Sequence, residues 1–279
     1  MIGHGASANV HKILDPKTNK KYAGKFIGKE YLKKTPKRVI SVTSEIATLR
    51  KLDHPGIVKL IEVHEIEDYV ILVLEHLEGE PLHPDLFKYS KNRENEVRDI
   101  FLQITSSLKY MNDYGLMHRD IKPNNLRFLE KYDKDRPEDN VIKLIDFGFA
   151  EYYTGDKYTR YYCGTVGYMC PFLMNMNKNY PQNYGPEVDY FSIGVMLYYA
   201  LTGQKVFNGK NHEEKRKLNK LNKVPVDKIN DSGISLEAKD LILKLLVADP
   251  RIRLKMNDIL DHPYFVSDSV LVARGQSNY

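Results

Sequence analysis

The stretch GLMHRDIKPNNLRFL, Gly115 to Leu129, packs His, Arg, Asp, Lys and Asn into eight residues between two short apolar runs. A capped, solvated turn would account for the three residues HRD on their own. A site for an anionic ligand would account for the whole polar segment. The choice between these readings depends on what other parts of the chain would bring to the same place.

A second acidic motif follows one strand later, where IDFG places Asp146 after the apolar run VIKLI. Phosphoryl transfer needs oxygen ligands for magnesium, a carboxylate that faces the attacking hydroxyl, and a cation near the moving phosphate. Asn125 and Asp146 suit the ligand role, Asp120 suits the hydroxyl-orienting role, and Lys122 suits the cation. These residues therefore favour an active site over a capped turn.

The N-terminal segment IGHGASANV supplies a candidate phosphate loop, with Gly3 and Gly5 followed by Ala8 and Val10. Small residues before a strand let backbone N–H groups approach an anion closely. Taken alone the signal is weak, because Gly-x-Gly also marks ordinary tight turns.

A lysine in a predicted strand strengthens this interpretation. Lys25 lies within KYAGKFI, where its apolar neighbours leave the ammonium group in need of a partner. Glu45 follows twenty residues later on a predicted helix. An ion pair between the two would aim the ammonium group at the phosphates of a nucleotide.

The order of predicted elements indicates an α+β architecture with two lobes. The first third reads as short strands, such as KYAGKFI and DYVILVLEHL, interrupted by one helix over 39–52. Helical patterns dominate from Asn95 onward, and 130–140 reads as an exposed loop between two strands. We expect a small lobe over 1–76 and a larger helical lobe over 77–279.

Composition narrows the class of protein without naming it. The chain has 279 residues, a modest net charge of +5 that is spread along the sequence, and two cysteines. We therefore expect a single-domain, monomeric protein that binds neither nucleic acid nor membrane. The cysteine count and the absence of a signal-peptide core predict a cytoplasmic location, with access to the nucleus.

The motifs Gly-x-Gly, Lys, Glu, HRDxKxxN and DFG occur in the order seen in protein kinases, and the chain resembles that family from Ile2 to about Phe265. The resemblance implies the two-lobed kinase fold over 1–279, with ATP and Mg²⁺ as cofactors and a protein as substrate. HRDxK and GTVGYMCP resemble the Ser/Thr kinases. Phrases such as SEIATLRKLDHPGIVKL look most like the calcium/calmodulin-dependent group.

The resemblance also implies roles for single residues. The residues expected to act in catalysis are Asp120, Lys122, Lys25, Glu45 and Thr165. The residues expected to contact the nucleotide are Ile2, Gly3, Gly5, Ala8, Val10, Ala23, Lys25, Leu74, Glu75, Leu77 and Arg127. Metal ligation is expected of Asn125 and Asp146. Asp189 resembles the buried acid that holds the backbone of the catalytic loop.

Arg119, directly before Asp120, marks the type of kinase that is often controlled by phosphorylation of the activation segment. The family position for that phosphate falls on Tyr161, with Thr159 close by. We expect phosphorylation at Thr159 or Tyr161, by an upstream kinase or by autophosphorylation in trans.

Two departures from the family pattern support an alternative, a pseudokinase that binds nucleotide as a scaffold. Phe172 replaces a glutamate that normally pairs with an arginine near the position of Arg253. Arg253 should then find a backbone carbonyl or another acceptor, or else the activation segment is displaced. Arg127 replaces an apolar residue beneath adenine, where it would stack on the base or weaken ATP binding. A small-molecule phosphotransferase ranks last, because it has no need of Lys122 or of the loop around Thr165.

Overall fold

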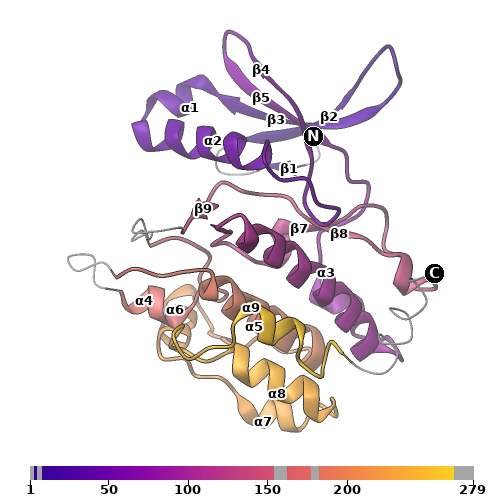
Figure 1. Cartoon of the computed structure of the whole chain (residues 1–279), viewed down its shortest axis with the longest axis vertical. Coiled ribbons are helices and arrows are strands. Elements are labelled where there is room, and N and C mark those ends of the chain that lie inside the picture. Colours follow the sequence, from indigo (N-terminus) through magenta and orange to yellow (C-terminus); the bar gives the residue numbers. More distant parts are fainter. Residues whose placement is uncertain (1–2, 5–7, 154–161, 177–181, 267–279) are drawn as a thin grey trace.

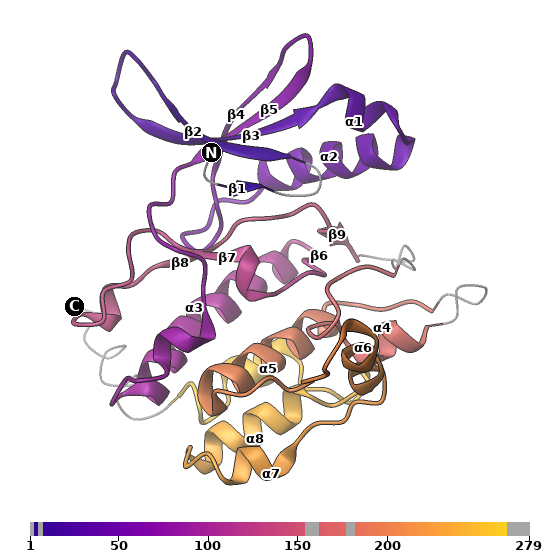
Figure 2. The same cartoon turned by 180° about the vertical axis from the view of Figure 1, so that it is seen from behind.

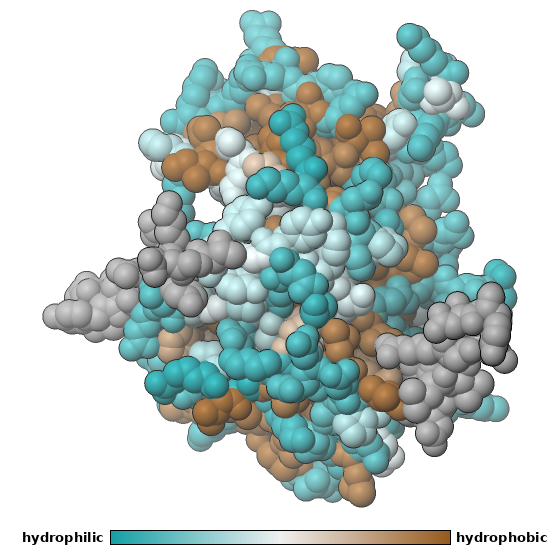
Figure 3. Space-filling model, in the orientation of Figure 1, coloured by the Kyte–Doolittle hydropathy of each residue, from teal (hydrophilic) through white to brown (hydrophobic). Residues whose placement is uncertain are grey.

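The computed structural model describes residues 3–4, 8–153, 162–176 and 182–266, arranged in two lobes (Figure 1). The upper lobe contains a five-stranded antiparallel sheet with the strand order β1-β2-β3-β5-β4. Its strands are β1 (Gly3–His4), β2 (Asn9–Leu14), β3 (Lys21–Gly28), β4 (Leu60–Glu65) and β5 (Tyr69–Glu75). On the face seen in Figure 3, hydrophobic surface is most extensive over this upper lobe. The two-lobed α+β kinase fold predicted above is confirmed.

Two helices, α1 (Lys29–Lys33) and α2 (Pro36–Leu49), lie on the same side of the sheet (Figure 1). Helix α2 begins and ends three residues before the predicted range 39–52. It begins at Pro36 because the fixed φ of proline suits the first helical position. Helix α1 was not predicted, since a helix of five residues is too short to show a helical period.

The lower lobe is built around α5 (Glu187–Thr202), which is buried along nearly its whole length. The other helices are α3 (Arg93–Asp113), α4 (Pro171–Asn175), α6 (His212–Lys220), α7 (Val226–Asn230), α8 (Leu236–Leu245) and α9 (Met256–Leu260). A Cβ at Gly194 would lie 2.7 Å from the Cβ of Leu245, so α5 and α8 pack in close contact. The long apolar run of α5 is thus explained by burial in the core. In the part of the chain covered by the structure, no helix combines the length and apolar character needed to span a membrane.

Two short strand pairs carry the motif segments. Strand β6 (Leu116–Met117) pairs with β9 (Glu151–Tyr152), and β7 (Leu126–Phe128) pairs with β8 (Ile142–Leu144). The second pair is the predicted hairpin around the loop 130–140. Figure 2 shows β7 and β8 between α3 and the upper sheet. HRDIKPNN lies between β6 and β7, and DFG between β8 and β9, so both motifs face the junction of the lobes.

The segment 78–82, which connects the two lobes, is hydrogen-bonded to residues of the lower lobe. The N–H of Glu78 donates to the carbonyl of Leu129 at 2.8 Å, and the N–H of Leu82 donates to the carbonyl of Leu126 at 2.9 Å. Between them, a Cβ at Gly79 would lie only 2.1 Å from the carbonyl oxygen of Glu130. The segment 78–82 therefore lies directly against β7 and the residues that follow it, and only a glycine fits at position 79.

Candidate active site

A closed set of hydrogen bonds surrounds the carboxylate of Asp120, which is 5% exposed. The hydroxyl of Thr165 donates to Oδ1 of Asp120 at 2.6 Å. The ammonium group of Lys122 donates to Oδ2 of Asp120 at 2.7 Å and to Oγ1 of Thr165 at 2.9 Å. Residues from two separate motifs, HRDxK and GTVGYMCP, are thus in direct contact.

Asn125 joins the same set from the short 3-10 turn Pro123–Asn125. Its side-chain nitrogen donates to the backbone carbonyl of Asp120 at 2.8 Å and to its Oδ2 at 3.2 Å. Because the nitrogen is used in this way, the amide oxygen is left to act as a ligand.

The backbone of this loop is fixed from below by Asp189 in α5. Its carboxylate oxygens accept hydrogen bonds from the N–H groups of His118 and Arg119, both at 2.7 Å. Arg119 has a φ of 69°, a left-handed conformation that a residue other than glycine adopts only when its surroundings hold it. Burial raises the pKa of Asp189 to about 7, although the two N–H donors act in the opposite direction.

On the opposite wall, the ammonium group of Lys25 lies 2.6 Å from Oε1 of Glu45 and 3.5 Å from Oδ1 of Asp146. Burial alone would lower the pKa of Lys25, but the combined attraction of the two carboxylates outweighs burial and raises it. Burial would likewise raise the pKa of Asp146, yet the charge of Lys25 and the N–H of Gly148 keep it below its ordinary value. Both groups are therefore charged at neutral pH, and they lie close together.

The aromatic ring of Phe147 connects the two walls. It contacts the ring of His118 edge to face, with centroids 5.3 Å apart, and both side chains are buried. Leu49 of α2 is also buried in the same core cluster, and Leu60 packs against it. The core cluster therefore includes residues of both lobes.

A cleft opens between the lobes beside these groups. The predicted nucleotide and metal residues that line it are Gly3, Ala8, Val10, Ala23, Lys25, Leu74, Glu75, Leu77, Asn125, Arg127 and Asp146. Residues Ile2 and Gly5, also predicted to bind the nucleotide, lie outside the described residues. Sequence reasoning did not assign Val58, His76, Asn124 and Ile145 to this cleft, although all four line it.

Asn124 and Ile145 lie inside the quoted motifs HRDIKPNN and IDFG, but neither motif assigns them a role in the cleft. Val58 and Ile145 are apolar wall residues, and any of several side chains could do the same work. His76 lies between two predicted contacts, Glu75 and Leu77, and this neighbourhood was the only available signal.

Two polar side chains, Arg127 and His76, line the cleft near the end of β5. Arg127 extends from β7 and is partly buried. The Nδ1 atom of His76 is buried and has no hydrogen-bond partner among the described residues. Burial lowers the pKa of His76, and the nearby positive charges, including Arg127, add to this effect. The histidine is therefore neutral near pH 7, and Arg127 supplies the positive charge here.

The N–H of Glu75 donates to the carbonyl of Lys59 at 2.9 Å and is not available to a bound base. Its carboxylate accepts from the ammonium group of Lys143 in β8 at 2.8 Å, which ties the end of β5 to the lower lobe. The edge of the cleft is thus fixed by its own hydrogen bonds.

The buried guanidinium of Arg253, 2% exposed, has replaced its missing carboxylate partner with other acceptors. It donates from Nε to the carbonyl of Val247 at 2.8 Å and from Nη2 to the carbonyl of Ala248 at 3.1 Å. Nη1 donates to the carbonyl of Glu187, and Nη2 lies 2.9 Å from Sγ of Cys170. The expectation of carbonyl acceptors is confirmed. Displacement of the segment, the other expectation, does not follow, because Thr165 still reaches Asp120.

Of the three predicted regulatory residues, the structure describes Arg119 alone. Arg119 is placed, and its guanidinium lies against Glu151 of β9. Thr159 and Tyr161, the predicted phosphorylation sites, lie outside the described residues. Phosphorylation of either stays a prediction.

The donor set of the cleft suits magnesium. Within the described ranges no group of three or more His, Cys, Asp and Glu side chains could hold a metal ion. Magnesium, however, is typically bound by one or two protein oxygens together with substrate phosphates and water. Asn125 and Asp146 match that requirement, and the side chain of Asp146 is 47% exposed toward solvent.

Comparison with known proteins gives the family. A model of the protein kinase domain matches residues 1–265. The chain is 34% identical to the probable serine/threonine-protein kinase fhkE of Dictyostelium discoideum, over 95% of this chain and 37% of that protein. It is 33% identical to a probable myosin light chain kinase of the same organism, over 96% of this chain and 82% of that protein. It is 34% identical to calcium/calmodulin-dependent protein kinase type IV of Mus musculus, over 94% of this chain and 53% of that protein.

A two-lobed fold with a paired strand lysine, the HRD aspartate and the DFG aspartate beside one cleft is typical of a phosphotransferase domain. The chain belongs to the protein kinase domain family. Its relatives include Ser/Thr kinases and a calcium/calmodulin-dependent kinase, which confirms the resemblance to that type and group. The chain spans about half or less of the length of two of the three relatives named.

Proposed function

We propose that this chain is an active serine/threonine kinase that transfers the γ-phosphate of Mg-ATP to a hydroxyl group of a protein. The observation that carries the proposal is the contact of Asp120, Lys122 and Thr165 within 3 Å of one another. A carboxylate held by an ammonium group and a hydroxyl has the composition that hydroxyl activation requires.

In the proposed reaction, the hydroxyl oxygen of the substrate forms a bond to the γ-phosphorus while the bond from that phosphorus to the β–γ bridging oxygen breaks. ADP leaves with the bridging oxygen. Asp120 accepts the proton of the substrate hydroxyl. To reach Oδ1, that hydroxyl has to displace the hydroxyl of Thr165, which donates to the same oxygen. Lys122 places a positive charge beside Asp120, where it compensates charge on the transferred group.

The nucleotide is proposed to lie in the cleft with its phosphates toward Lys25 and its base between Ala23 and Leu74 above and Arg127 below. Ala23 and Leu74 are cross-strand partners in β3 and β5, so the two strands present them together. The pair of Lys25 with Glu45 aims the ammonium group at the phosphates.

Asn125 and Asp146 are proposed to hold magnesium. When bound, magnesium supplies positive charge that neutralises the phosphate oxygens. The charge of Lys25 keeps the Asp146 carboxylate ionised, so it is ready to act as a ligand.

The pseudokinase alternative has lost much of its support. The anchor around Arg253 is intact despite Phe172, and the groups needed for transfer are assembled. Arg127 lines the cleft without closing it. We therefore place catalysis ahead of scaffolding.

We also propose that the substrate is a protein and that the chain acts as a monomer. Neither nucleic acid nor membrane is a partner in this proposal. The location is cytoplasmic, with access to the nucleus. The modest net charge of +5, spread along the chain, supports the exclusion of nucleic acid.

The test is transfer of labelled phosphate from Mg-ATP to a mixed protein substrate. Wild type is compared with Asp120→Asn and with Asp113→Asn, an exposed acid paired with Lys109 on α3. We expect transfer by wild type and by Asp113→Asn, and a loss of about a hundred- to ten-thousandfold in Asp120→Asn. Stabilisation of the wild type by ATP without any transfer would contradict the proposal and select the scaffold.

A further inference from the structure

An ion pair next to the catalytic loop has not been used by the proposed mechanism. Nη1 of Arg119 lies 2.6 Å from Oε2 of Glu151, and the arginine side chain is only 9% exposed. The same guanidinium donates from Nε to the carbonyl of Phe149 at 2.6 Å and from Nη1 to the hydroxyl of Tyr184 at 3.2 Å. Arg119 thus binds a carboxylate that belongs to the fold itself.

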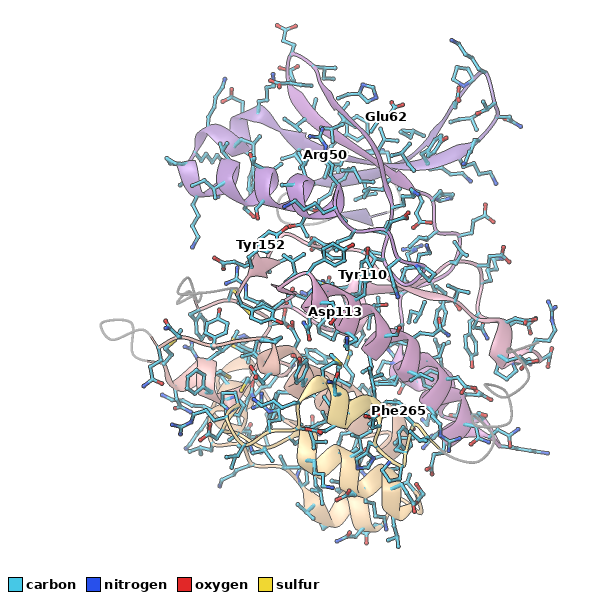
Figure 4. The ribbon with its side chains drawn as sticks, viewed as in Figure 1. Arg50, Glu62, Tyr110, Asp113, Tyr152 and Phe265 are labelled. Carbon is cyan, nitrogen blue, oxygen red and sulfur yellow. The ribbon has the colours of Figure 1, made fainter. Side chains whose placement is uncertain are left out.

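Glu151 is held in place by a strand. It belongs to β9 and pairs directly with Met117 of β6, two residues before Arg119. The next residue, Tyr152, contributes a ring that lies 5.1 Å from the ammonium group of Lys51. Because neighbouring side chains on a strand point to opposite faces, β9 is fastened on both sides. Figure 4 shows Tyr152 between the upper lobe and the end of α3 that carries Tyr110 and Asp113.

The pair acts on the conformation of the catalytic loop. Arg119 directly precedes Asp120, and its backbone has the left-handed φ of 69°. Asp189 holds the N–H of Arg119, while Glu151 holds its side chain. Loss of either contact leaves a strained residue with one attachment fewer, directly beside the carboxylate that orients the substrate hydroxyl.

We infer that Glu151 is a positioning residue that sets Arg119 and the catalytic loop without a phosphate, so that the chain is active with an unphosphorylated activation segment. This inference rests on the proposed kinase function. A phosphate group bound to the guanidinium of Arg119 would also lie near the carboxylate of Glu151. Repulsion between the two anions would offset much of what the phosphate gains from the arginine.

The experiment uses the full chain after treatment with a protein phosphatase, with intact mass verifying that no phosphate remains. The variants are Glu151→Gln, Glu151→Asp, and the control Glu65→Gln. The control removes the 2.7 Å ion pair between Glu65 and Lys29 in the upper lobe, far from the loop. Measured quantities are kcat, KM for ATP, KM for a peptide, and Tm.

We expect wild type and Glu65→Gln to retain their activity after dephosphorylation. In Glu151→Gln, kcat should fall about ten- to a hundredfold while KM for ATP stays within about twofold, because the loop is misplaced and the cleft is not. Glu151→Asp keeps the charge and should recover part of the lost kcat. A purely structural role for Glu151 would lower Tm without this separation of kcat from KM.

Two results would overturn the inference: a loss of more than about tenfold in kcat on dephosphorylation of the wild type, or a Glu151→Gln variant with the kcat of wild type. If Glu151→Gln does not fold, the wild type before and after phosphatase treatment decides alone. Absence of transfer by wild type in both states would instead contradict the proposed function, so the two failures are distinguishable.

Discussion

The surroundings of Asp120 and of Arg253 deal with a buried charge in different ways. Around Asp120 every motif residue is present, and the carboxylate meets an ammonium group and a hydroxyl. Around Arg253 the expected carboxylate is replaced by Phe172, and the guanidinium is held by backbone carbonyls and by the Cys170 thiol. Asp120 has to act on a ligand, which requires its own charge. The guanidinium of Arg253 only needs hydrogen-bond acceptors for its N–H groups, and backbone carbonyls can provide them.

The largest effect is expected where a charge faces the ligand. Lys25→Met should lower kcat about a hundred- to a thousandfold, since the cation near the phosphates is lost. It also leaves Glu45 buried without its partner, which should cost about 3 kcal/mol of unfolding free energy. Steady-state kinetics and urea unfolding measure the two effects.

Lys29→Met is the matched control for Lys25→Met, because it removes a more exposed lysine that pairs with Glu65 on the same lobe. It should leave kcat unchanged. Equal kcat values for the two variants would contradict the role given to Lys25.

The next largest effect is expected on stability, at the buried guanidinium of Arg253. Arg253→Met removes hydrogen bonds to several carbonyls that are then left buried without a donor, so the unfolding free energy should fall by about 3 kcal/mol. The neighbouring Arg251→Met removes only a side chain that is 84% exposed and pairs with Asp249, and it should change stability by less than about 0.5 kcal/mol. Thermal unfolding of both variants checks this. Similar Tm values would mean that Arg253 is not an anchor.

A smaller effect is expected in acid. Burial lowers the pKa of His118 below its ordinary value of 6.5, although the carboxylates of Asp146 and Asp120 oppose this. The unfolded chain therefore binds a proton more readily than the folded chain, and the stability that neutral His118 contributes is lost as pH falls below about 6.5.

His118→Phe should remove that dependence on pH, so that the difference in unfolding free energy between pH 8 and pH 5 becomes smaller. Urea unfolding at both pH values measures it. An unchanged difference would show that His118 is protonated equally in both states.

The smallest effect is expected at position 172. Phe172→Glu restores the type of residue that the family pattern carries, but the donors of Arg253 already have acceptors. The substitution should therefore fail to stabilise the protein, with a change of about 1 kcal/mol or less in the destabilising direction. A gain in Tm would show that Arg253 still lacks a partner.

The catalytic groups could be predicted because their chemistry fixes both residue type and spacing. Asp120, Lys122, Asn125 and Asp146 were found in this way, and the structure brings them to one cleft or into contact with it. Where any of several residue types can fill a position in the cleft, the sequence does not show which position lines it. The apolar wall residues Val58 and Ile145 were missed for this reason.

For contacts that depend on tertiary packing, the sequence could predict the type of interaction but not the partner residues. An acceptor for Arg253 was expected, but the choice of Val247, Ala248 and Cys170 depends on how two helices and a loop meet. The pairing of Arg119 with Glu151 was not foreseen, because nothing in the local sequence shows that β9 returns beside the loop. Helix α1 was missed since its five residues show no period.

The segment 78–82, which lies hydrogen-bonded against β7, has a mechanical consequence. Since β5 ends at Glu75, His76 and Leu77 separate it along the chain from the segment that is bonded to β7. A relative rotation of the lobes would therefore change the backbone conformation at these two residues. Both also line the cleft. A compound bound against them would therefore occupy the proposed nucleotide site and restrict that change of conformation.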